Sequence, residues 1–500
     1  IGILAFTACN DPEDVDIAPE VMVEESVELT AGSADFSNYV SIGNSLTAGF
    51  TDGALFQAGQ ELSLPNLLSQ KFSLVGGGSF TQPLTNDNLG GLAAGGARIQ
   101  DPRLVFGGAG PVGLETLIGP VTVTTDIALN NPTGPFNNLG VPGAKSFHLL
   151  APGYGNLANV SLGLANPYAV RLTGTTPNAS VLELAVAQAP SFFSIWGGEN
   201  DVLGYATSGG DGTNPITPVS GAPGVGFDGS YGALIATLTA GGAQGVVANI
   251  PNVLNIPHFT TVPHNPVPLD AATAAAVNGA YIPYNGGLQA AFGALAGTGL
   301  FTQEELDART ISFVEGANNA VVIEDETLTD LGAINPAFAA LPKIRQATAD
   351  DLLVLPAASF IGTLAVEGNP LTVNGVAIPL ADKWVLLPSE QEEITAATEA
   401  FNQIIAATAS QAGLAFVDAN SLLNQLANGG ITSGQFTLTS SLVTGSAFSL
   451  DGIHPTARGY ALLANEFMKA IDVTYGSNFE ASGNLLNVGD YPTNFSPMLQ

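Results

Sequence analysis

The feature that most constrains the fold is a repeated order of short apolar segment, turn and helical stretch. Four apolar segments have strand length and few charges: residues 38–42, 191–196, 245–250 and 414–418. Four longer segments have the apolar spacing or composition of helices: residues 62–72, 231–240, 389–411 and 457–471. Strands that alternate with helices indicate a parallel sheet covered on both faces. The sequence therefore predicts an α/β protein, a three-layer α/β/α architecture around a central parallel sheet.

Two regions interrupt this order. Residues 73–135 are rich in Gly, Pro and Asn and predict a long lid or rim loop. Residues 258–388 contain an Ala-rich helical stretch at 271–280 and a segment at 371–378 whose Asn-Gly pair predicts a β-hairpin. We expect residues 258–388 to form a large inserted cap or subdomain.

The chain is thus expected to have three parts. Residues 1–35 would be a signal-peptide remnant, a lipidation site and an acidic tether. Residues 36–475 would form one α/β domain that carries the insertion. Residues 476–500 are polar and predict an extended C-terminal tail.

Composition and charge exclude several classes of protein. Hydrophobic residues make up 46% of the 500 residues, so intrinsic disorder of the whole chain is excluded. The chain has 11 Lys+Arg against 43 Asp+Glu, a net charge of −32. Such a chain repels nucleic-acid phosphates and anionic lipid surfaces, so neither is expected as an electrostatic partner.

Cysteine and histidine usage argues against a local metal site. The single cysteine, Cys9, allows no intramolecular disulfide and no thiolate cluster. No two of the four histidines have a metal-ligand spacing of three or four: His148, His258, His264 and His454. We predict no metal and no cofactor. We expect His148 to be a helix-face or core residue, and His258 and His264 to be structural or rim residues.

The first nine residues resemble the end of a bacterial lipoprotein signal peptide. The chain starts at Ile1 without Met and is expected to be trimmed or incomplete; its apolar start runs to Thr7, Ala8 and Cys9. That pattern implies acylation of Cys9, although a buried cysteine in an N-terminal strand is the alternative. The acidic residues from 10 to 35 resemble a surface-export signal. We therefore expect a bacterial cell-envelope protein on the outer membrane surface, held by lipid because no other apolar run reaches about 20 residues.

The first motif that could take part in catalysis is Gly43-Asn44-Ser45-Leu46, directly after a predicted strand. A Ser in such a turn can point its Oγ into a cleft while its own N–H faces a developing oxyanion. Alone the motif is weak, because a Ser that caps a helix has the same appearance.

The second motif is Asp451-Gly452-Ile453-His454, which precedes the last predicted helix. A tight turn can bring the Asp451 carboxylate to Nδ1 of His454 and leave Nε2 free to take a Ser proton. The alternative is a surface loop in which Asp451 serves as a local turn residue.

Two further segments offer hydrogen-bond donors for an oxyanion. Gly198-Glu199-Asn200-Asp201 ends the apolar segment 191–196, and the Asn200 amide can donate unless it only forms an Asx turn. Gly143, in Val-Pro-Gly-Ala, can bring its backbone N–H close to a ligand.

The four segments, in this order, resemble those of the SGNH hydrolases, also called GDSL esterases or lipases. The resemblance covers about residues 36–260 and 388–475 and implies a flavodoxin-like α/β/α fold. It implies that Ser45 is the nucleophile, His454 the general base and then acid, and Asp451 the orienting carboxylate. It also implies an oxyanion hole made by Ser45, Gly143 and Asn200.

The function implied is hydrolysis of carboxylic esters through an acyl-enzyme, with a small-molecule or lipid ester as substrate. The hydrophobic composition favours an apolar acyl pocket, and the runner-up substrate is an acetylated carbohydrate. A non-catalytic surface-binding lipoprotein on the same scaffold is the alternative from another class. The sequence departs from the family at Asn44, where Asp is usual, so the start of the helix after Ser45 should differ in its electrostatics.

Overall fold

The structure, a computed structural model, describes residues 27–369 and 372–500. The predicted lipidation site Cys9 and most of the predicted acidic tether lie outside the described residues. Among the residues that the structure describes, helices of membrane-spanning length and hydropathy are absent.

The core of the fold is a five-stranded sheet in which every strand pair is parallel. Its strands are β1 (Tyr39–Gly43), β6 (Asn138–Gly140), β7 (Phe192–Trp196), β8 (Gln244–Ala248) and β15 (Ala415–Val417). Their spatial order is β6-β1-β7-β8-β15, which in chain order reads 2-1-3-4-5. This is the order of flavodoxin-like doubly wound sheets. The predicted α/β class with a central parallel sheet is confirmed.

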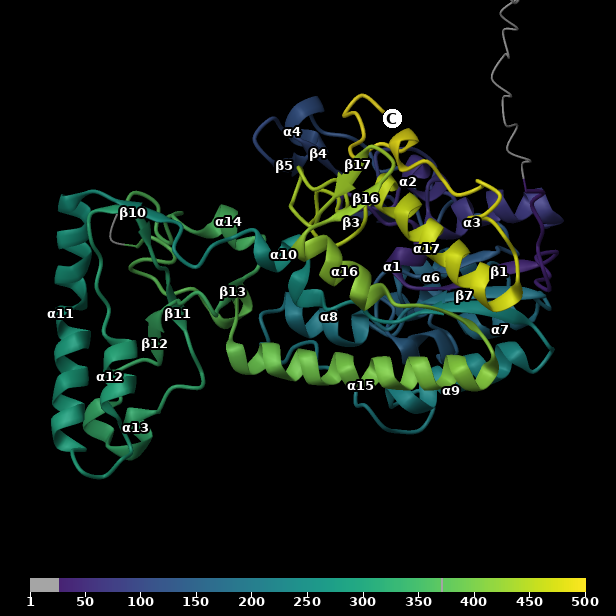
Figure 1. Cartoon of the computed structure of the whole chain (residues 1–500). Coiled ribbons are helices and arrows are strands. Elements are labelled where there is room, and N and C mark those ends of the chain that lie inside the picture. Colours follow the sequence, from purple (N-terminus) through teal and green to yellow (C-terminus); the bar gives the residue numbers. More distant parts are fainter. Residues whose placement is uncertain (1–26, 370–371) are drawn as a thin grey trace, which may run out of the picture.

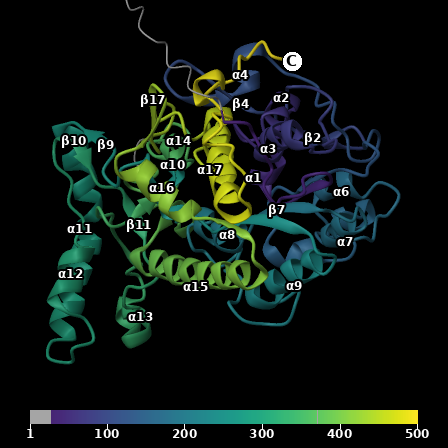
Figure 2. The ribbon, with the colours of Figure 1, turned by 45° about the vertical axis from the view of Figure 1, so that its right-hand side comes forward.

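Helices cover both faces of the sheet (Figures 1 and 2). Helices α3 (Leu64–Phe72) and α17 (Ala457–Tyr475) pack together on one face. Helices α7 (Val181–Val186), α9 (Phe227–Thr239) and α15 (Pro388–Ala412) pack on the other. The result is the three-layer arrangement that the alternating pattern predicts.

The central strands are buried along their whole length, which explains their unbroken apolar sequences. All five residues of β1 and all five of β7 are buried. The polar side chains among them satisfy one another, since Ser194 Oγ lies 2.9 Å from Ser41 Oγ and 2.7 Å from Tyr39 OH. Buried hydroxyl groups of this kind cost little because each has a hydrogen-bond partner.

The two long helices of the α/β core follow their sequence patterns. In α15 the buried residues Ile394, Phe401 and Ile405 share one face, and Gly413 ends the helix at a φ of 65°. In α17 the side chain of Thr456 caps the first turn by accepting a hydrogen bond from the N–H of Gly459. The predicted helices at 389–411 and 457–471 therefore agree with the structure.

The sheet has its topological switch point between β1 and β7, where successive connections leave in opposite directions. Ligands of doubly wound sheets bind outside the carboxyl ends of strands at such a point. Gly43 and Trp196, the last residues of β1 and β7, lie opposite each other in register. The segments that carry Ser45 and Asn200 begin directly after these two residues.

The inserted region forms a lobe beside the sheet (Figure 1). Its elements are α10 (Pro257–Thr260), β9 (Val267–Leu269), α11 (Ala271–Ala294), α12 (Gln303–Arg309), β10 (Gly316–Asn319), β11 (Val322–Glu324), α13 (Leu331–Ile334), η4 (Pro336–Phe338), β12 (Ile344–Gln346), β13 (Leu352–Leu353), α14 (Ala357–Phe360), η5 (Asp382–Trp384) and β14 (Val385–Leu386). The outer part of the lobe has its own small apolar cluster, which includes Leu288, Phe301 and Leu306. The inner part joins the main core through Val277 and Val322.

The hairpin predicted at 371–378 is absent from the described part of that segment. Val373 forms an isolated antiparallel bridge with Leu364, and Asn374 bridges to Ile378 in parallel. Gly375 does adopt a positive φ of 79°, as the Asn-Gly pair predicts. The Asn-Gly turn therefore forms, but too few residues flank it in extended pairs to make two strands.

The rim region and the remaining connections are built from short elements. These are α1 (Ser45–Ala48), α2 (Gln57–Glu61), η1 (Ser73–Val75), β2 (Leu92–Ala94), β3 (Ala97–Gln100), β4 (Leu104–Phe106), β5 (Pro111–Gly113), α4 (Leu114–Ile118), η2 (Ser146–Leu150), α5 (Leu157–Val160), α6 (Pro167–Thr173), α8 (Asn200–Thr207), η3 (Val253–Asn255), α16 (Ala419–Asn428), β16 (Ile431–Ser433), β17 (Phe436–Leu438) and η6 (Val488–Asp490). Two antiparallel pairs, β2–β3 and β4–β5, lie within the predicted rim loop 73–135.

The C-terminal residues are packed rather than extended into solvent. Phe479 and Val488 are fully buried in the main core. Further along, the guanidinium of the buried Arg103 donates hydrogen bonds to the carbonyl oxygens of Ser496 and Leu499. The polar composition of this segment concealed these anchoring contacts.

Candidate active site

The turn after β1 presents Ser45 at the first position of α1. Gly43 is required there, because a Cβ at this position would lie 2.1 Å from the carbonyl oxygen of Trp196. The side chain of Asn44 caps α1 by accepting a hydrogen bond from the N–H of Leu46 at 2.9 Å. Ser45 is 7% exposed, so its hydroxyl lies at the floor of the site.

Asp451 and His454 form the hydrogen bond that their spacing predicts. His454 Nδ1 lies 2.8 Å from Asp451 Oδ2, and both side chains are nearly buried. The carboxylate also accepts hydrogen bonds from the N–H groups of Ile453 and His454 and from the Ser449 hydroxyl. With Nδ1–H directed to the carboxylate, Nε2 is the nitrogen left to accept a proton.

The environment keeps Asp451 ionised. Burial alone would favour its neutral form, but the charge of a protonated His454 and the converging hydrogen bonds outweigh burial and hold the pKa of Asp451 well below its ordinary value. A permanent carboxylate at this place stabilises an imidazolium on His454. That is the electrostatic role expected of the third member of a Ser-His-Asp triad.

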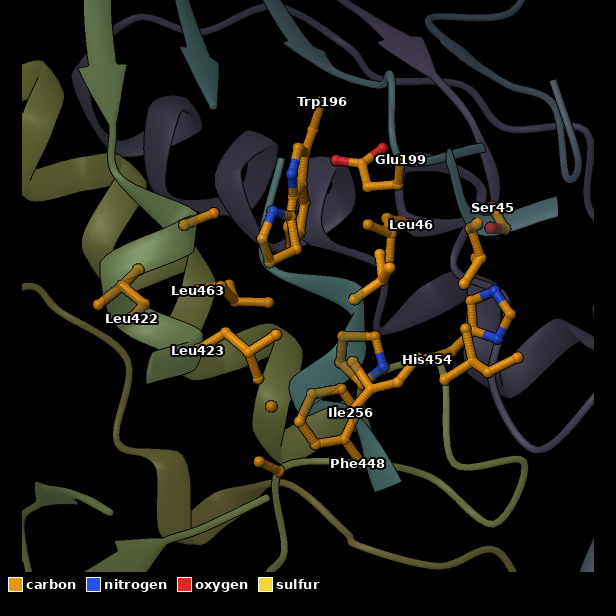
Figure 3. Close-up of a pocket in the computed structure, with 18 of the residues that line it drawn as sticks. Ser45, Leu46, Trp196, Glu199, Ile256, Leu422, Leu423, Phe448, His454 and Leu463 are labelled. Atoms are coloured by element: carbon orange, nitrogen blue, oxygen red, sulfur yellow. The ribbon is translucent and has the colours of Figure 1, made fainter. Parts of the chain in front are cut away.

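Ser45 and His454 line the same space, and their side chains lie next to each other in Figure 3. The imidazole also packs against the Phe50 ring, with 4.7 Å between the ring centroids. Within residues 27–369 and 372–500 no hydrogen bond joins Ser45 Oγ to His454. Such bonds are often long in free enzymes and shorten when substrate binds.

The two further predicted donors lie at the same site. Gly143 and Asn200 line a cavity together with Ser45 and His454. The Asn200 side chain donates to the carbonyl oxygen of Ala144 at 3.0 Å, which ties it to the segment of Gly143. Gly143 has a φ of 79°, a left-handed conformation that suits glycine. Four of the five residues named from the sequence therefore line one cavity, and the fifth, Asp451, contacts that cavity through His454.

Asp201 joins the Gly143 and Asn200 segments more firmly. Its carboxylate accepts hydrogen bonds from the N–H and the hydroxyl of Ser146, each at 2.8 Å. Burial raises the pKa of Asp201, while these two hydrogen bonds favour its charged form. This contact fixes the loop that carries Gly143 against the start of α8.

An apolar cavity extends from Ser45 and His454 (Figure 3). Its lining side chains come from the ends of β1 and β7, from residues 251–256 and 447–455, and from the helices α8, α16 and α17. The apolar ones include Leu46, Trp196, Val253, Ile256, Leu422, Leu423, Leu426, Phe448, Leu462 and Leu463. The cavity has a volume of about 80 Å³. An engineered apolar cavity of about 150 Å³ accepts benzene, so this one suits a short acyl chain unless side chains move.

A second, more polar cavity lies on the other side of Ser45 and His454. Besides Gly143 and Asn200 it is lined by Lys145 and Asn214. Neither cavity has a described lining residue from the inserted region 258–388. The insertion therefore forms a lobe rather than a cap over this site.

Sequence reasoning missed three contributors to the site. The sequence pattern assigns no role to Glu199, although this residue lies in the Gly198–Asp201 motif, because the burial of a side chain depends on the tertiary structure. It also missed Gly53, whose N–H donates to Asp451 Oδ2 at 2.8 Å across 398 residues of sequence. Helix α16 had a readable signal, since Asp418 caps it and Leu422, Leu423 and Leu426 recur at helical spacing.

The other histidines lie outside the reacting centre. His148 stacks on Tyr154 with ring centroids 4.7 Å apart. His258 is buried, and its backbone N–H donates to the carbonyl oxygen of Gly452 in the turn between Asp451 and His454. Burial lowers the pKa of both imidazoles to about 4.

Three carboxyl groups lie as close together as the ligands of a metal ion. Oxygens of Glu326, Asp382 and Glu390 all lie within 4.8 Å of one another. Burial together with mutual repulsion raises the pKa of Glu390 to about 8 and that of Asp382 to about 6. The group shares no residue with either cavity at Ser45.

Comparison of the chain with protein-family profiles, curated proteins and solved structures found no match.

Proposed function

We propose that this protein is a serine ester hydrolase of the kind that the SGNH resemblance implies. The observation that carries the proposal is the 2.8 Å contact between His454 Nδ1 and Asp451 Oδ2 beside a cavity that Ser45 and His454 share. These residues converge at the carboxyl end of β1, next to the switch point of the sheet.

The first half of the reaction forms an acyl-enzyme. Nε2 of His454 takes the proton of Ser45 Oγ as Oγ attacks the ester carbonyl carbon. The carbonyl electron pair moves to oxygen, and the N–H groups of Ser45 and Gly143 and the Asn200 amide stabilise the resulting oxyanion. Collapse of the tetrahedral intermediate breaks the bond to the alcohol oxygen, which takes the proton from His454.

The second half releases the acid. Water attacks the acyl carbon while His454 Nε2 takes one of its protons. Collapse of the second tetrahedral intermediate breaks the bond to Ser45 Oγ, which regains its proton from His454. Asp451 stays ionised throughout and stabilises the imidazolium that forms in each half.

The two cavities suggest how an ester is divided across Ser45. The apolar cavity suits a short acyl chain, because it is small and leucine side chains from α16 and α17 line it. The second cavity has a mixed lining that includes Lys145, Asn214 and Thr207, so it suits the alcohol part. This second observation favours an ester of a polar alcohol, which keeps an acetylated carbohydrate as the second candidate substrate.

The test is labelling with a fluorophosphonate, together with hydrolysis of p-nitrophenyl esters from acetyl to palmitoyl. We expect wild type to be labelled at Ser45 and to cleave short esters best. The Ser45→Ala variant should do neither. Folded wild type that takes no label and cleaves no ester would instead indicate a binding protein on this scaffold.

We further propose that Cys9 carries lipid and holds the protein at the bacterial outer membrane surface. The support is the apolar sequence that ends at Cys9 and the acidic residues after it. When the chain is expressed with a complete signal peptide, metabolic labelling with an alkyne fatty acid should mark the processed protein. The Cys9→Ala variant should take up no label. Protease treatment of intact cells then tests surface display, since a periplasmic protein would be protected.

A further inference from the structure

A buried side-chain contact joins the start of the nucleophile helix to the start of the helix that carries Asn200. Asn44 is the N-cap of α1, and Glu199 is the N-cap of α8. Asn44 Nδ2 donates a hydrogen bond to Glu199 Oε2. The two residues are 1% and 4% exposed, so water does not compete for this contact.

The amide of Asn44 serves both helices at once. Its Oδ1 accepts the N–H of Leu46 and so shapes the turn that holds Ser45. Its Nδ2 reaches Glu199, the residue directly before Asn200. An ionised Asp at position 44 could make the first contact, but it has no proton to donate, so the second contact would require a protonated Glu199.

Glu199 depends on this contact. Its other carboxylate oxygen, Oε1, is buried and has no hydrogen-bond partner among the described residues. In Figure 3 the Glu199 side chain lies beside Trp196, in the lining of the apolar cavity. Loss of the Asn44 donor would leave a buried carboxyl group with no side-chain partner, which is costly.

We propose that Asn44 and Glu199 are a matched pair of positioning residues that sets the Ser45 turn against the oxyanion donor Asn200. This inference rests on the proposed hydrolase function. It explains the departure at Asn44: an amide stands at position 44 because a carboxyl group stands at position 199. Two carboxyl groups facing each other here could not both be ionised without repulsion, and their hydrogen bond would last only while one of them holds a proton.

The test exchanges the two groups. In Asn44→Asp two acidic groups face each other. At alkaline pH, where the pair loses its shared proton, we expect kcat for a p-nitrophenyl ester to fall about 100-fold with little change in KM, the size of effect that a small misplacement of reacting groups produces. In Glu199→Gln the amide oxygen still accepts from Asn44, so kcat should fall much less than in Asn44→Asp, by under about tenfold. In the double variant Asn44→Asp/Glu199→Gln the introduced amide donates to the introduced carboxylate instead. That reversed hydrogen bond should restore kcat to within about threefold of wild type.

A second double variant, Asn44→Asp/Glu199→Leu, is the matched control. It removes the repulsion but supplies no donor, so a positioning hydrogen bond predicts that kcat stays low. Equal rescue by Leu and Gln, or a fully active Asn44→Asp, overturns the inference. If Asn44→Asp does not fold, Glu199→Leu alone gives the test, because it should lower kcat about tenfold in protein with wild-type circular dichroism.

The outcomes separate this inference from the proposed function. Suppose that wild type hydrolyses esters but Asn44→Asp/Glu199→Gln does not recover activity. This result overturns the proposed Asn44–Glu199 pair and leaves the proposed hydrolase function unaffected. A folded wild type with no fluorophosphonate label and no ester hydrolysis overturns both.

Discussion

The backbone N–H of Gly53 lies 2.8 Å from Oδ2 of Asp451, the same oxygen that His454 Nδ1 approaches at 2.8 Å. Gly53 belongs to the loop that follows the Ser45 helix, so the loop of the nucleophile holds the carboxylate that orients the base. Asp52, next to it, accepts the N–H of Leu450 through Oδ1. The two ends of the α/β domain are thereby fixed to each other at the site.

The first prediction concerns the carboxylate itself. In Asp451→Asn the side chain keeps its size, but its amide would turn its N–H₂ toward His454 and favour the wrong tautomer. In serine hydrolases this change lowers kcat about 10⁴-fold, and we expect a loss of that order in ester hydrolysis near neutral pH.

Ser449→Ala is the matched control for this prediction. It removes one neutral hydroxyl donor from Asp451 Oδ1 and leaves the contact with His454. A hydrogen bond to a charged group is worth about 1.5 to 3 kcal/mol, so kcat should fall by no more than about 10²-fold. A loss in Asp451→Asn no larger than in this control would contradict the triad assignment.

The second prediction concerns the oxyanion. Asn200→Ala removes a side-chain donor that would stabilise negative charge only in the transition state. We expect kcat to fall about 10²- to 10³-fold with KM nearly unchanged. Asn214→Ala, in the same cavity, should alter KM more than kcat. The reverse pattern in the two variants would remove Asn200 from the oxyanion hole.

The fold could be predicted from the sequence because its signals are local and strong. The apolar segments 191–196 and 245–250 are too short for helices and end at turn residues, and both became buried strands of the sheet. The sequence prediction was wrong where tertiary packing, and not the local sequence, determines the structure. The short flanks of the Asn374-Gly375 turn made bridges rather than a hairpin.

The site was predicted as far as its residues lie in short motifs. The Asp451–His454 hydrogen bond follows from a spacing of three across a turn, and the structure contains it. The contacts of Gly53 and Glu199 do not follow from any spacing. Each joins segments more than 150 residues apart, and only the packing of the whole sheet brings them together.

The third prediction concerns acyl-chain selectivity. Leu422 is half-buried at the apolar cavity, so a larger side chain there can be accommodated without opening the core. Leu422→Trp should shift the best p-nitrophenyl ester to a shorter acyl chain, mainly through a higher KM for the longer ones. Leu422→Met, which conserves volume, should keep the wild-type profile. An unchanged profile in Leu422→Trp would place the acyl chain elsewhere.

The fourth prediction concerns the pH dependence of stability. Burial raises the pKa of Glu199 from 4.5 to about 7, against hydrogen bonds from its own backbone and from Asn44. Between these values the folded state binds the proton more tightly than the unfolded state, so this group lowers stability as pH rises and its penalty is complete above about pH 7.

Glu199→Gln removes that penalty and isolates its size. The difference in free energy of unfolding, variant minus wild type, should increase by about 3 kcal/mol between about pH 5 and pH 8. Urea denaturation at the two pH values measures it, with the m-value as a check that the unfolded states are comparable. A difference that does not change with pH would mean that Glu199 titrates at its ordinary value.

The fifth prediction concerns the C-terminal segment. Arg103 is fully buried, donates to the carbonyl oxygens of Asn88, Ser496 and Leu499, and lies 5.2 Å from the centroid of the Phe56 ring. Burial lowers the pKa of Arg103, while the charge of Asp52 opposes that shift. The guanidinium therefore ties the C-terminus to the loop that also holds Asp451.

Arg103→Met should destabilise the protein by about 2 to 4 kcal/mol, because several charge-assisted hydrogen bonds to carbonyl oxygens are lost. Removal of residues 495–500 should cost less, since only part of these contacts goes. In the combined variant the two losses should not add, because they remove the same hydrogen bonds. Additive losses in urea denaturation would show that Arg103 stabilises the fold through other contacts than those with the C-terminus.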